Sequence, residues 1–285
     1  MLGAIIGDMV GSIYEFDPIK KKDFDIFDKR MAMTDDSILT IAIALVLMKH
    51  YPLSYDRASL DEIEKEISYS FVEMWKNNPY AGWGGRFSDW CYKIAHGGKI
   101  EPYHSYGNGS AMRVSSVAWV AKTEEELRML SKAVTEVTHN SFEGEKGAEA
   151  VAMAIFMALH GASKEEIGER MIKDYYPEIK DYDFDDLVKN YRFSEICQES
   201  VPQAIYCFLI SDSLEDAVRN CVGIGGDCDT TGAMAGAIAE AYYSKDKMGE
   251  FEKKYFDTMV HPKAKEVVIN FHKTIGSHKF DEYQK

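Results

Sequence analysis

Apolar residues recur three and four positions apart along most of this chain, which predicts helices rather than strands. Residues 37–50 are apolar nearly all round, which is typical of a helix buried on every side, and residues 61–76 have one apolar face. Residues 147–161 and 231–243 are rich in alanine and other small residues, so these helices can approach their neighbours closely. Because the alternating pattern of a strand is missing, we predict an all-α fold. Two further helices are predicted at residues 202–212 and 214–221.

Glycine clusters interrupt the predicted helices, and loops of this kind let the backbone come close to a ligand. An acidic and aromatic segment at residues 174–189 predicts a surface helix pair or excursion. The sequence has no Pro/Ser-rich linker, no low-complexity tract and no repeat of 20–50 residues. We therefore predict one compact domain over residues 1–285. The glycine clusters lie at residues 82–85, 107–109 and 223–226.

Composition narrows the class of protein. The chain has 285 residues, 46% apolar and 28% charged, which excludes intrinsic disorder or a fibrous design for the whole chain. With 33 Lys and Arg against 47 Asp and Glu, the net charge is −14, which argues against nucleic acid or a membrane surface as the main partner. Five cysteines without a C-x-x-C pair favour free thiols in a reducing cytosol.

Location and assembly follow from what the sequence lacks. No apolar run reaches the roughly 18 residues that a membrane span needs. The first residues carry no basic segment of the kind that opens a secretory signal. We expect a cytoplasmic protein. A monomer is expected because there is no coiled-coil seam or long exposed apolar stripe.

Two acidic stretches directly precede apolar helices. They are Thr34-Asp35-Asp36 and Asp227-Cys228-Asp229-Thr230. Each can be explained as a helix cap, worth roughly 0.5–2 kcal/mol. In an extended segment, however, Asp227 and Asp229 would point the same way, and buried carboxylates resist ionisation unless a cation compensates them. Carboxylate and hydroxyl oxygens suit Mg²⁺ or Mn²⁺, and the absence of HExxH or a cysteine pair disfavours zinc.

Three further elements carry candidate chemistry. Glu15 follows a glycine turn, a position that surface or capping residues commonly occupy. A glycine loop precedes a predicted helix, where unpaired N–H groups can hold a phosphate, although a simple helix-start turn explains it too. His139 lies in a loop, where a lone histidine is more often structural. The glycine loop is Ser105-Tyr106-Gly107-Asn108-Gly109-Ser110.

Taken together and in this order, these elements resemble the ADP-ribosylglycohydrolase family. The resemblance runs from Gly3 to about Tyr243, and it rests on TDD and GGDxDT at helix starts with GNGSAMR between them. It implies an all-α fold around two divalent cations, Mg²⁺ or Mn²⁺. One ion would be held by Thr34, Asp35, Asp36 and Asp229, and the other by Asp227, Asp229 and Thr230.

The resemblance also implies roles for the remaining elements. Glu15 matches a glutamate that acts at the scissile bond, and His139 matches a histidine that lines the same cleft. The substrate-binding loop would comprise Ser105, Tyr106, Gly107, Asn108, Gly109 and Ser110. The implied substrate is ADP-ribose or an ADP-ribosylated protein, with the acceptor left open among arginine, serine and another group. Cys228 is expected to point away from the metals.

The implied reaction is hydrolysis of the bond between ribose C1″ and the modified side chain. Glu15 would stabilise the developing cation or exchange a proton with the leaving group. A non-catalytic ADP-ribose-binding protein or a toxin-immunity protein of the same fold is the alternative from another class. A phosphohydrolase that acts on the diphosphate is a third.

Overall fold

Helices make up almost all of the regular structure in residues 1–284, which the computed structural model describes. Within this range the one β contact is a bridge between Gly107 and Ile196. The predicted all-α class is confirmed. The helices are α1 (Leu2–Gly11), α2 (Asp35–His50), α3 (Arg57–Asn77), α4 (Gly85–Ala95), α5 (Ser115–Val120), α6 (Glu124–Glu136), α7 (Phe142–Leu159), α8 (Lys164–Asp174), α9 (Phe184–Asn190), α10 (Cys197–Leu209), α11 (Leu214–Ile224), α12 (Cys228–Tyr243), α13 (Glu250–Thr258) and α14 (Pro262–Thr274), with 3-10 turns η1 (Asn108–Ser110), η2 (Pro177–Asp181) and η3 (Asp281–Tyr283).

The predicted helices correspond to α2, α3, α7, α10, α11 and α12, with shifted ends. Helix α10 begins at Cys197, five residues before the predicted start, because Pro202 lies inside the helix instead of opening it. The acidic segment 174–189 contains η2 and most of α9, in agreement with the predicted pair of short helical elements. Helix α1 was not predicted: it is buried on all sides and has no side-chain cap to mark its start.

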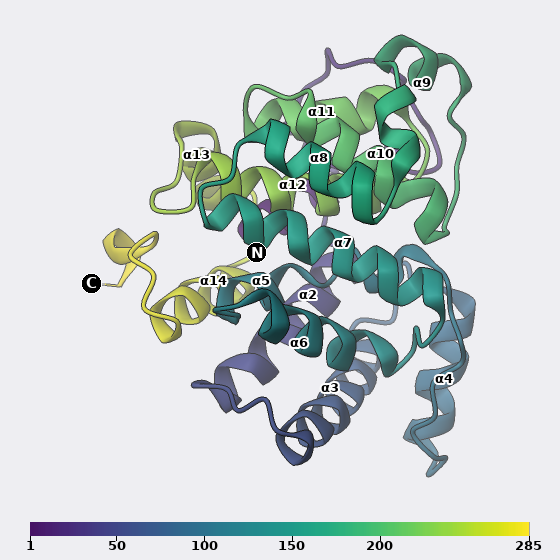
Figure 1. Ribbon diagram of the computed structural model, residues 1–285, viewed down its shortest axis with the longest axis vertical. Helices are drawn as coiled ribbons and strands as arrows, with labels where there is room; N and C mark the ends of the chain where they lie inside the picture. Colours follow the sequence, from purple (N-terminus) through teal and green to yellow (C-terminus); the bar gives the residue numbers. More distant parts are fainter. Residues whose placement is uncertain (285) are drawn as a thin grey trace.

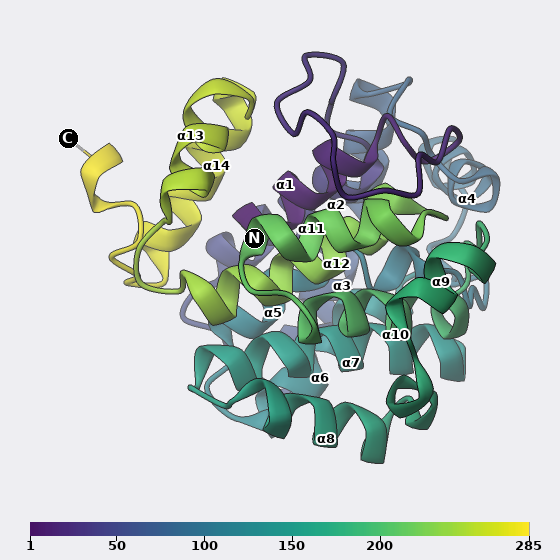
Figure 2. The same cartoon turned by 90° about the horizontal axis from the view of Figure 1, so that it is seen from above.

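The centre of the fold is the packing of α1 against α12, which also contacts α7 and α11. Figure 1 shows α7, α11 and α12 close together, and Figure 2 shows α1 beside α11 and α12. Helices α1 and α12 meet through glycines. A Cβ added at Gly7 would lie 1.9 Å from the carbonyl oxygen of Gly232, and one at Gly3 would lie 2.1 Å from that of Gly236. Backbone therefore touches backbone along this contact, which confirms the close approach expected for the small-residue helix α12. Helix α1 thereby comes to lie directly beside the first turn of α12.

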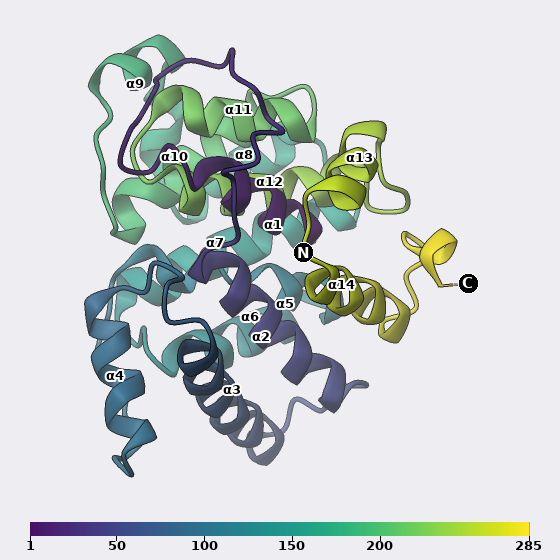
Figure 3. The ribbon, with the colours of Figure 1, turned by 180° about the vertical axis from the view of Figure 1, so that it is seen from behind.

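The connection from α1 to α2 is a long loop, residues 12–34, that passes over α11 and near α9 (Figures 2 and 3). The ammonium group of Lys20 fixes it by donating to the carbonyls of Val188 at 2.7 Å and Tyr191 at 2.8 Å. Arg219 of α11 donates to the carbonyls of Lys22 and Phe24. The loop is thus tied to the residues that follow α9.

Helices α13 and α14 lie at one side of the molecule (Figure 2) and are joined to α12 by buried charges. Lys279 pairs with Glu240 at 2.8 Å and with Glu252 at 3.1 Å, all three being almost fully buried. In the part of the chain that the structure describes, no helix is long and apolar enough to cross a bilayer.

Candidate active site

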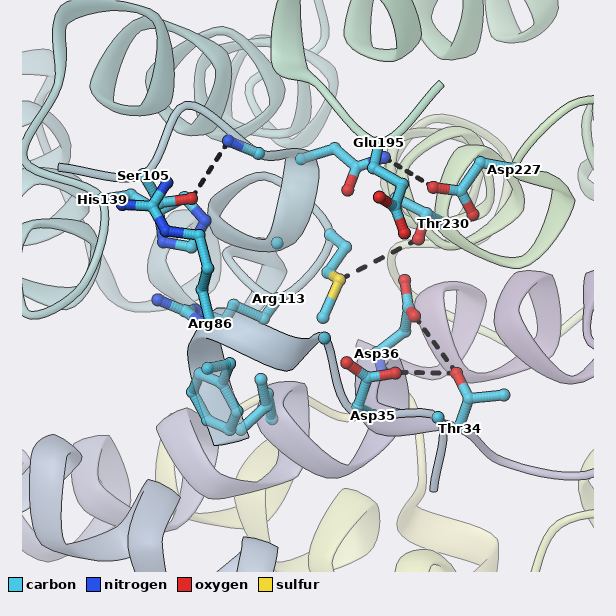
Figure 4. A pocket seen from close by; sticks show the side chains of 18 of the residues that line it. Thr34, Asp35, Asp36, Arg86, Ser105, Arg113, His139, Glu195, Asp227 and Thr230 are labelled. Atoms are coloured by element: carbon cyan, nitrogen blue, oxygen red, sulfur yellow. Dashed lines mark hydrogen bonds between the residues drawn. The ribbon is translucent and has the colours of Figure 1, made fainter. Parts of the chain in front are cut away.

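A cavity of about 310 Å³ opens where the loop after α1, the first turns of α2 and α12, and the glycine loop come together (Figure 4). Every residue predicted from the sequence to form the site lines this cavity except Ser110. The hydroxyl of Ser110 is buried and donates to the carbonyl of Gly144 at 2.8 Å. Its placement supports the loop instead of facing a ligand.

Carboxylates gather at one end of the cavity. Ligand oxygens of Asp8, Asp36 and Asp229 lie within 4.8 Å of one another, and so do those of Glu15, Asp227 and Asp229. Asp229 belongs to both groups. Because α2 and α12 both begin here with acidic first turns, the positive ends of two helix dipoles face this cluster.

One reason given for this convergence was wrong. Asp227 and Asp229 were expected to lie in an extended segment, but Asp229 lies in the first turn of α12 and Asp227 is its N-cap residue. The two carboxylates nevertheless approach each other. The thiol of Cys228 donates to the carbonyl of Gly226 and is fully buried.

Burial and mutual repulsion make this cluster hard to ionise. Burial, followed by the charge of Asp229, raises the pKa of Glu15 to about 8. Burial also raises the pKa of Asp227 to about 6. Burial and then the charge of Asp229 raise the pKa values of Asp35 and Asp36 well above the usual range, and burial and the charge of Asp227 do the same for Asp229.

The donor set fits divalent cations. Asp36 Oδ1 is buried and has no hydrogen-bond partner within residues 1–284, so it is free to bind an ion. Asp227 is held by the side-chain amide of Asn108, which donates to its Oδ2 at 2.7 Å. Only carboxylate and hydroxyl oxygens are offered, and this chemistry matches Mg²⁺ or Mn²⁺.

The opposite end of the cavity is basic. The guanidinium group of Arg113 is 1% exposed and has no carboxylate within 4.0 Å in the described part of the chain. It donates to Thr138 Oγ1 at 2.6 Å and lies over the ring of Phe71. Burial lowers its pKa to about 10, so Arg113 remains a cation at neutral pH. Arg86 lies over the ring of Tyr103 on the same side (Figure 4).

His139 and the glycine loop complete this basic end. Burial and the charges of Arg113 and Arg86 hold the pKa of His139 well below its usual range, so the imidazole is neutral. A Cβ at Gly109 would lie 3.4 Å from this ring, so the backbone of the glycine loop packs close to the imidazole. The amide of Asn108 donates to the carbonyl of Glu195, which joins the loop to the residues before α10. The cavity therefore has an acidic and a basic end.

Comparison with known proteins identifies the family. The family model described as ADP-ribosylglycohydrolase matches residues 1–248. The chain belongs to the ADP-ribosylglycohydrolase family. It is 25% identical to the ADP-ribosylhydrolase ARH3 of Homo sapiens, with 88% of this chain and 86% of that protein aligned. It is 23% identical to the ADP-ribosylarginine hydrolase Tri1 of Pseudomonas putida, with 87% and 70% aligned.

A solved structure supports the fold. The chain superposes on an ADP-ribosylglycohydrolase-related protein complex with a TM-score of 0.71 at 20% identity, covering 96% of this chain and 97% of the other. At this identity the likeness concerns the fold alone. The expected family resemblance is confirmed by the family model over residues 1–248.

Several residues of this ADP-ribosylglycohydrolase site were not assigned to it from the sequence. Asp8 is fully buried on α1 and accepts hydrogen bonds from the amide of Thr34 at 3.0 Å, from the Thr34 hydroxyl at 2.7 Å, and from the amide and hydroxyl of Ser37. It thereby fixes the start of α2. Arg86, Arg113 and Glu195 were also missed as cavity residues. The available sequence signals were the GNGSAMR motif for Arg113 and the glycine cluster at residues 82–85 for Arg86, which directly follows it.

Proposed function

We propose that this protein is a divalent-cation-dependent hydrolase that removes ADP-ribose from a modified protein side chain by cleaving the C1″ glycosidic bond. The two-ended cavity is the observation that carries this proposal. ADP-ribose has a diphosphate next to a polyhydroxylated ribose, so it matches a basic end that adjoins a metal-binding end. Family membership supports the same reaction class.

Two ions, Mg²⁺ or Mn²⁺, would be held by the residues named from the resemblance. Thr34, Asp35, Asp36 and Asp229 would hold one, and Asp227, Asp229 and Thr230 the other. Once bound, divalent cations would neutralise the clustered carboxylates and supply an anchor for ribose hydroxyls. The free Asp36 Oδ1 and the shared position of Asp229 support this ligand set.

Side chains of the cavity bind the two ends of the substrate and act at the scissile bond. Arg113 and Arg86 bind the diphosphate, with Arg113 already desolvated and therefore more strongly attractive to an anion. Neutral His139 supports the glycine loop against which the adenosine end lies. Asn108 keeps Asp227 oriented toward the ribose. Glu15, half-buried at the acidic end, faces the bond that breaks and either stabilises the developing positive charge or exchanges a proton with the leaving group.

The test compares ADP-ribosyl-arginine and ADP-ribosyl-serine peptides incubated with Mg²⁺, Mn²⁺ or EDTA, with products identified by mass spectrometry. We expect free ADP-ribose that depends on the metal. AMP as the product would indicate a phosphohydrolase instead. ADP-ribose binding without any product would support a non-catalytic binder or an immunity protein.

The variant Glu15→Gln separates binding from chemistry. It is expected to bind ADP-ribose normally in calorimetry and to lose about 100-fold in rate if Glu15 acts as an acid or base. An exposed acid on α9, changed in Asp185→Asn, is the matched control and should leave both unaffected. Full activity in Glu15→Gln would refute its role at the scissile bond.

A further inference from the structure

Behind the basic end of the cavity, three buried side chains form a chain of hydrogen bonds. Arg113 Nη2 donates to Thr138 Oγ1 at 2.6 Å, and this oxygen lies 2.7 Å from His139 Nδ1. None of the three residues is more than 4% exposed. Arg113 and His139 line the cavity, whereas Thr138 does not. Thr138 therefore connects two cavity residues from behind.

The local structure on both sides fixes the geometry of this chain. Thr138 and His139 follow the end of α6, and their amides donate to the carbonyl of Thr135 at 3.2 and 2.9 Å. The guanidinium carbon of Arg113 lies 4.5 Å from the centre of the Phe71 ring. The arginine and the hydroxyl that accepts from it are therefore held by separate parts of the fold.

The direction of the protons along the chain follows from the chemistry of its members. A guanidinium group can only donate, so Thr138 Oγ1 accepts from Arg113. The hydroxyl has one hydrogen of its own, and within residues 1–284 the one other hydrogen bond found for it is that with His139 Nδ1. A buried hydroxyl hydrogen without an acceptor is costly. The Thr138 hydroxyl therefore donates to Nδ1, which carries no hydrogen.

The imidazole hydrogen is consequently at Nε2. A neutral imidazole has one N–H group, and burial together with the charges of Arg113 and Arg86 holds the pKa of His139 well below its usual range. Nε2 would lie 3.4 Å from a Cβ added at Gly109 and 3.7 Å from one at Gly107. Figure 4 shows His139 on the same side of the cavity as Arg86. The Nε2–H group therefore lies at the basic end, beside the glycine loop.

We propose that Arg113, acting through Thr138, is a positioning residue that fixes the Nε2–H tautomer of His139, so that this group donates to a phosphate oxygen of the bound diphosphate. The inference rests on the proposed function, which assigns the diphosphate to the basic end. The hydrogen bond at one imidazole nitrogen sets which nitrogen carries the hydrogen. In the other tautomer, Nε2 would present a lone pair to an anionic oxygen and repel it. Arg113 thus acts on the ligand by its charge and also by the tautomer of its neighbour.

The first measurement detects the tautomer by NMR of the imidazole nitrogens in protein with isotope-labelled histidine. The signals that are absent from His139→Gln identify this residue. At neutral pH, we expect the wild type to show a protonated Nε2 and a bare Nδ1. Thr138→Val removes the proton donor and should populate the Nδ1–H form, whereas Thr138→Ser keeps a hydroxyl and should retain the wild-type pattern.

The second measurement is the Kd of ADP-ribose, by calorimetry with Mg²⁺ present. Thr138→Val should weaken binding about tenfold or more, and Thr138→Ser should restore it. In a His139→Ala background, Thr138→Val should change the Kd little, because its effect passes through the imidazole. Thr135→Val is the matched control: the Thr135 hydroxyl is buried in the last turn of α6 and has no hydrogen-bond partner in residues 1–284, so the Kd should stay unchanged.

The possible failures can be told apart. An Nδ1–H tautomer in the wild type, or a wild-type spectrum and Kd in Thr138→Val, overturns the proposal. Equal losses from Thr138→Val with and without His139 overturn it too, and so does a failure of Thr138→Ser to restore binding, which would assign the loss to packing. Binding of ADP-ribose without release of it from either peptide refutes the hydrolase but not the role of Arg113. No binding of ADP-ribose by the wild type refutes the proposed function and, with it, the ligand assigned to His139.

Discussion

The variant Gly7→Ala tests whether the contact between α1 and α12 sets the geometry of the site. A Cβ at Gly7 would lie 1.9 Å from the carbonyl oxygen and 2.2 Å from the carbonyl carbon of Gly232. Both atoms belong to the backbone, so no side chain can turn aside. Carbon atoms rest about 3.5 Å from their neighbours, so the two helices would have to part by roughly 1.5 Å at this point.

The expected consequences follow from that displacement. Overpacking of a tight core costs about 1–3 kcal/mol or more in the free energy of unfolding. Asp8 is the next residue on α1, and Asp229 lies in the first turn of α12. Metal sites tolerate only about 0.2 Å in ligand distances. We therefore expect Mn²⁺ affinity to fall sharply and turnover to drop by about 100-fold or more.

Urea unfolding and Mn²⁺ titration by calorimetry or electron paramagnetic resonance measure the two effects. Gly168→Ala in α8 is the matched control, because its Cβ would meet the methyl groups of Leu209 at an ordinary 3.5 Å. That helix should gain about 0.5–1 kcal/mol from the better propensity of alanine, with unchanged metal binding. Wild-type stability and Mn²⁺ affinity in Gly7→Ala would refute the reasoning.

Three other outcomes are expected. Asp229→Asn should abolish divalent-cation binding and turnover. Without metal, its melting temperature should equal or exceed that of the wild type, because the variant relieves a repulsion between buried carboxylates. A lower melting temperature, measured by circular dichroism, contradicts this. Arg113→Met should weaken ADP-ribose binding about tenfold or more in calorimetry. Its free energy of unfolding in urea should change little, since the arginine has no carboxylate partner. Unchanged affinity argues against a diphosphate contact. Burial opposes ionisation of Glu240, but the charge of Lys279 holds the pKa of Glu240 well below 4.5. The ion pair therefore stabilises the fold above pH 4.5, and this stabilisation is lost as the pH falls through the depressed pKa. Lys279→Met should therefore cost about 3–5 kcal/mol at neutral pH and flatten the loss of stability on acidification, as urea unfolding at several pH values can show.

Local sequence signals predicted most of the long helices because each signal acts within one element. Thr34 caps α2 as expected, accepting from the amide of Asp36, and the apolar run that follows is buried almost completely. The motif residues were also brought together as predicted, with Ser110 as the exception. The predicted start of α10 was wrong, because Pro202 lies inside the helix and not at its first position.

Features that depend on distant segments could not be predicted in this way. Nothing in the sequence near Gly7 indicates that its partner is Gly232, so neither α1 nor the part played by Asp8 was foreseen. Arg113 had a motif to mark it but no indication that it would be buried without a counter-ion. Phe16 and Phe193 are distant in the sequence, and their rings lie 5.8 Å apart only because the 12–34 loop is tied to the end of α9.

The close contact between α1 and α12 also explains why the acids can be placed as they are. Buried carboxylates repel one another, and a loosely packed core would relax by moving them apart or by admitting water. Here backbone lies against backbone, and Gly11 lies so near the amide of Asp229 that an added Cβ would be 2.3 Å away. Asp8 on α1 and Asp229 on α12 are therefore held near each other by the packing of their helices. The favourable packing of the helices offsets the repulsion between the carboxylates. A divalent cation that binds the carboxylates would remove this repulsion and so raise the free energy of unfolding.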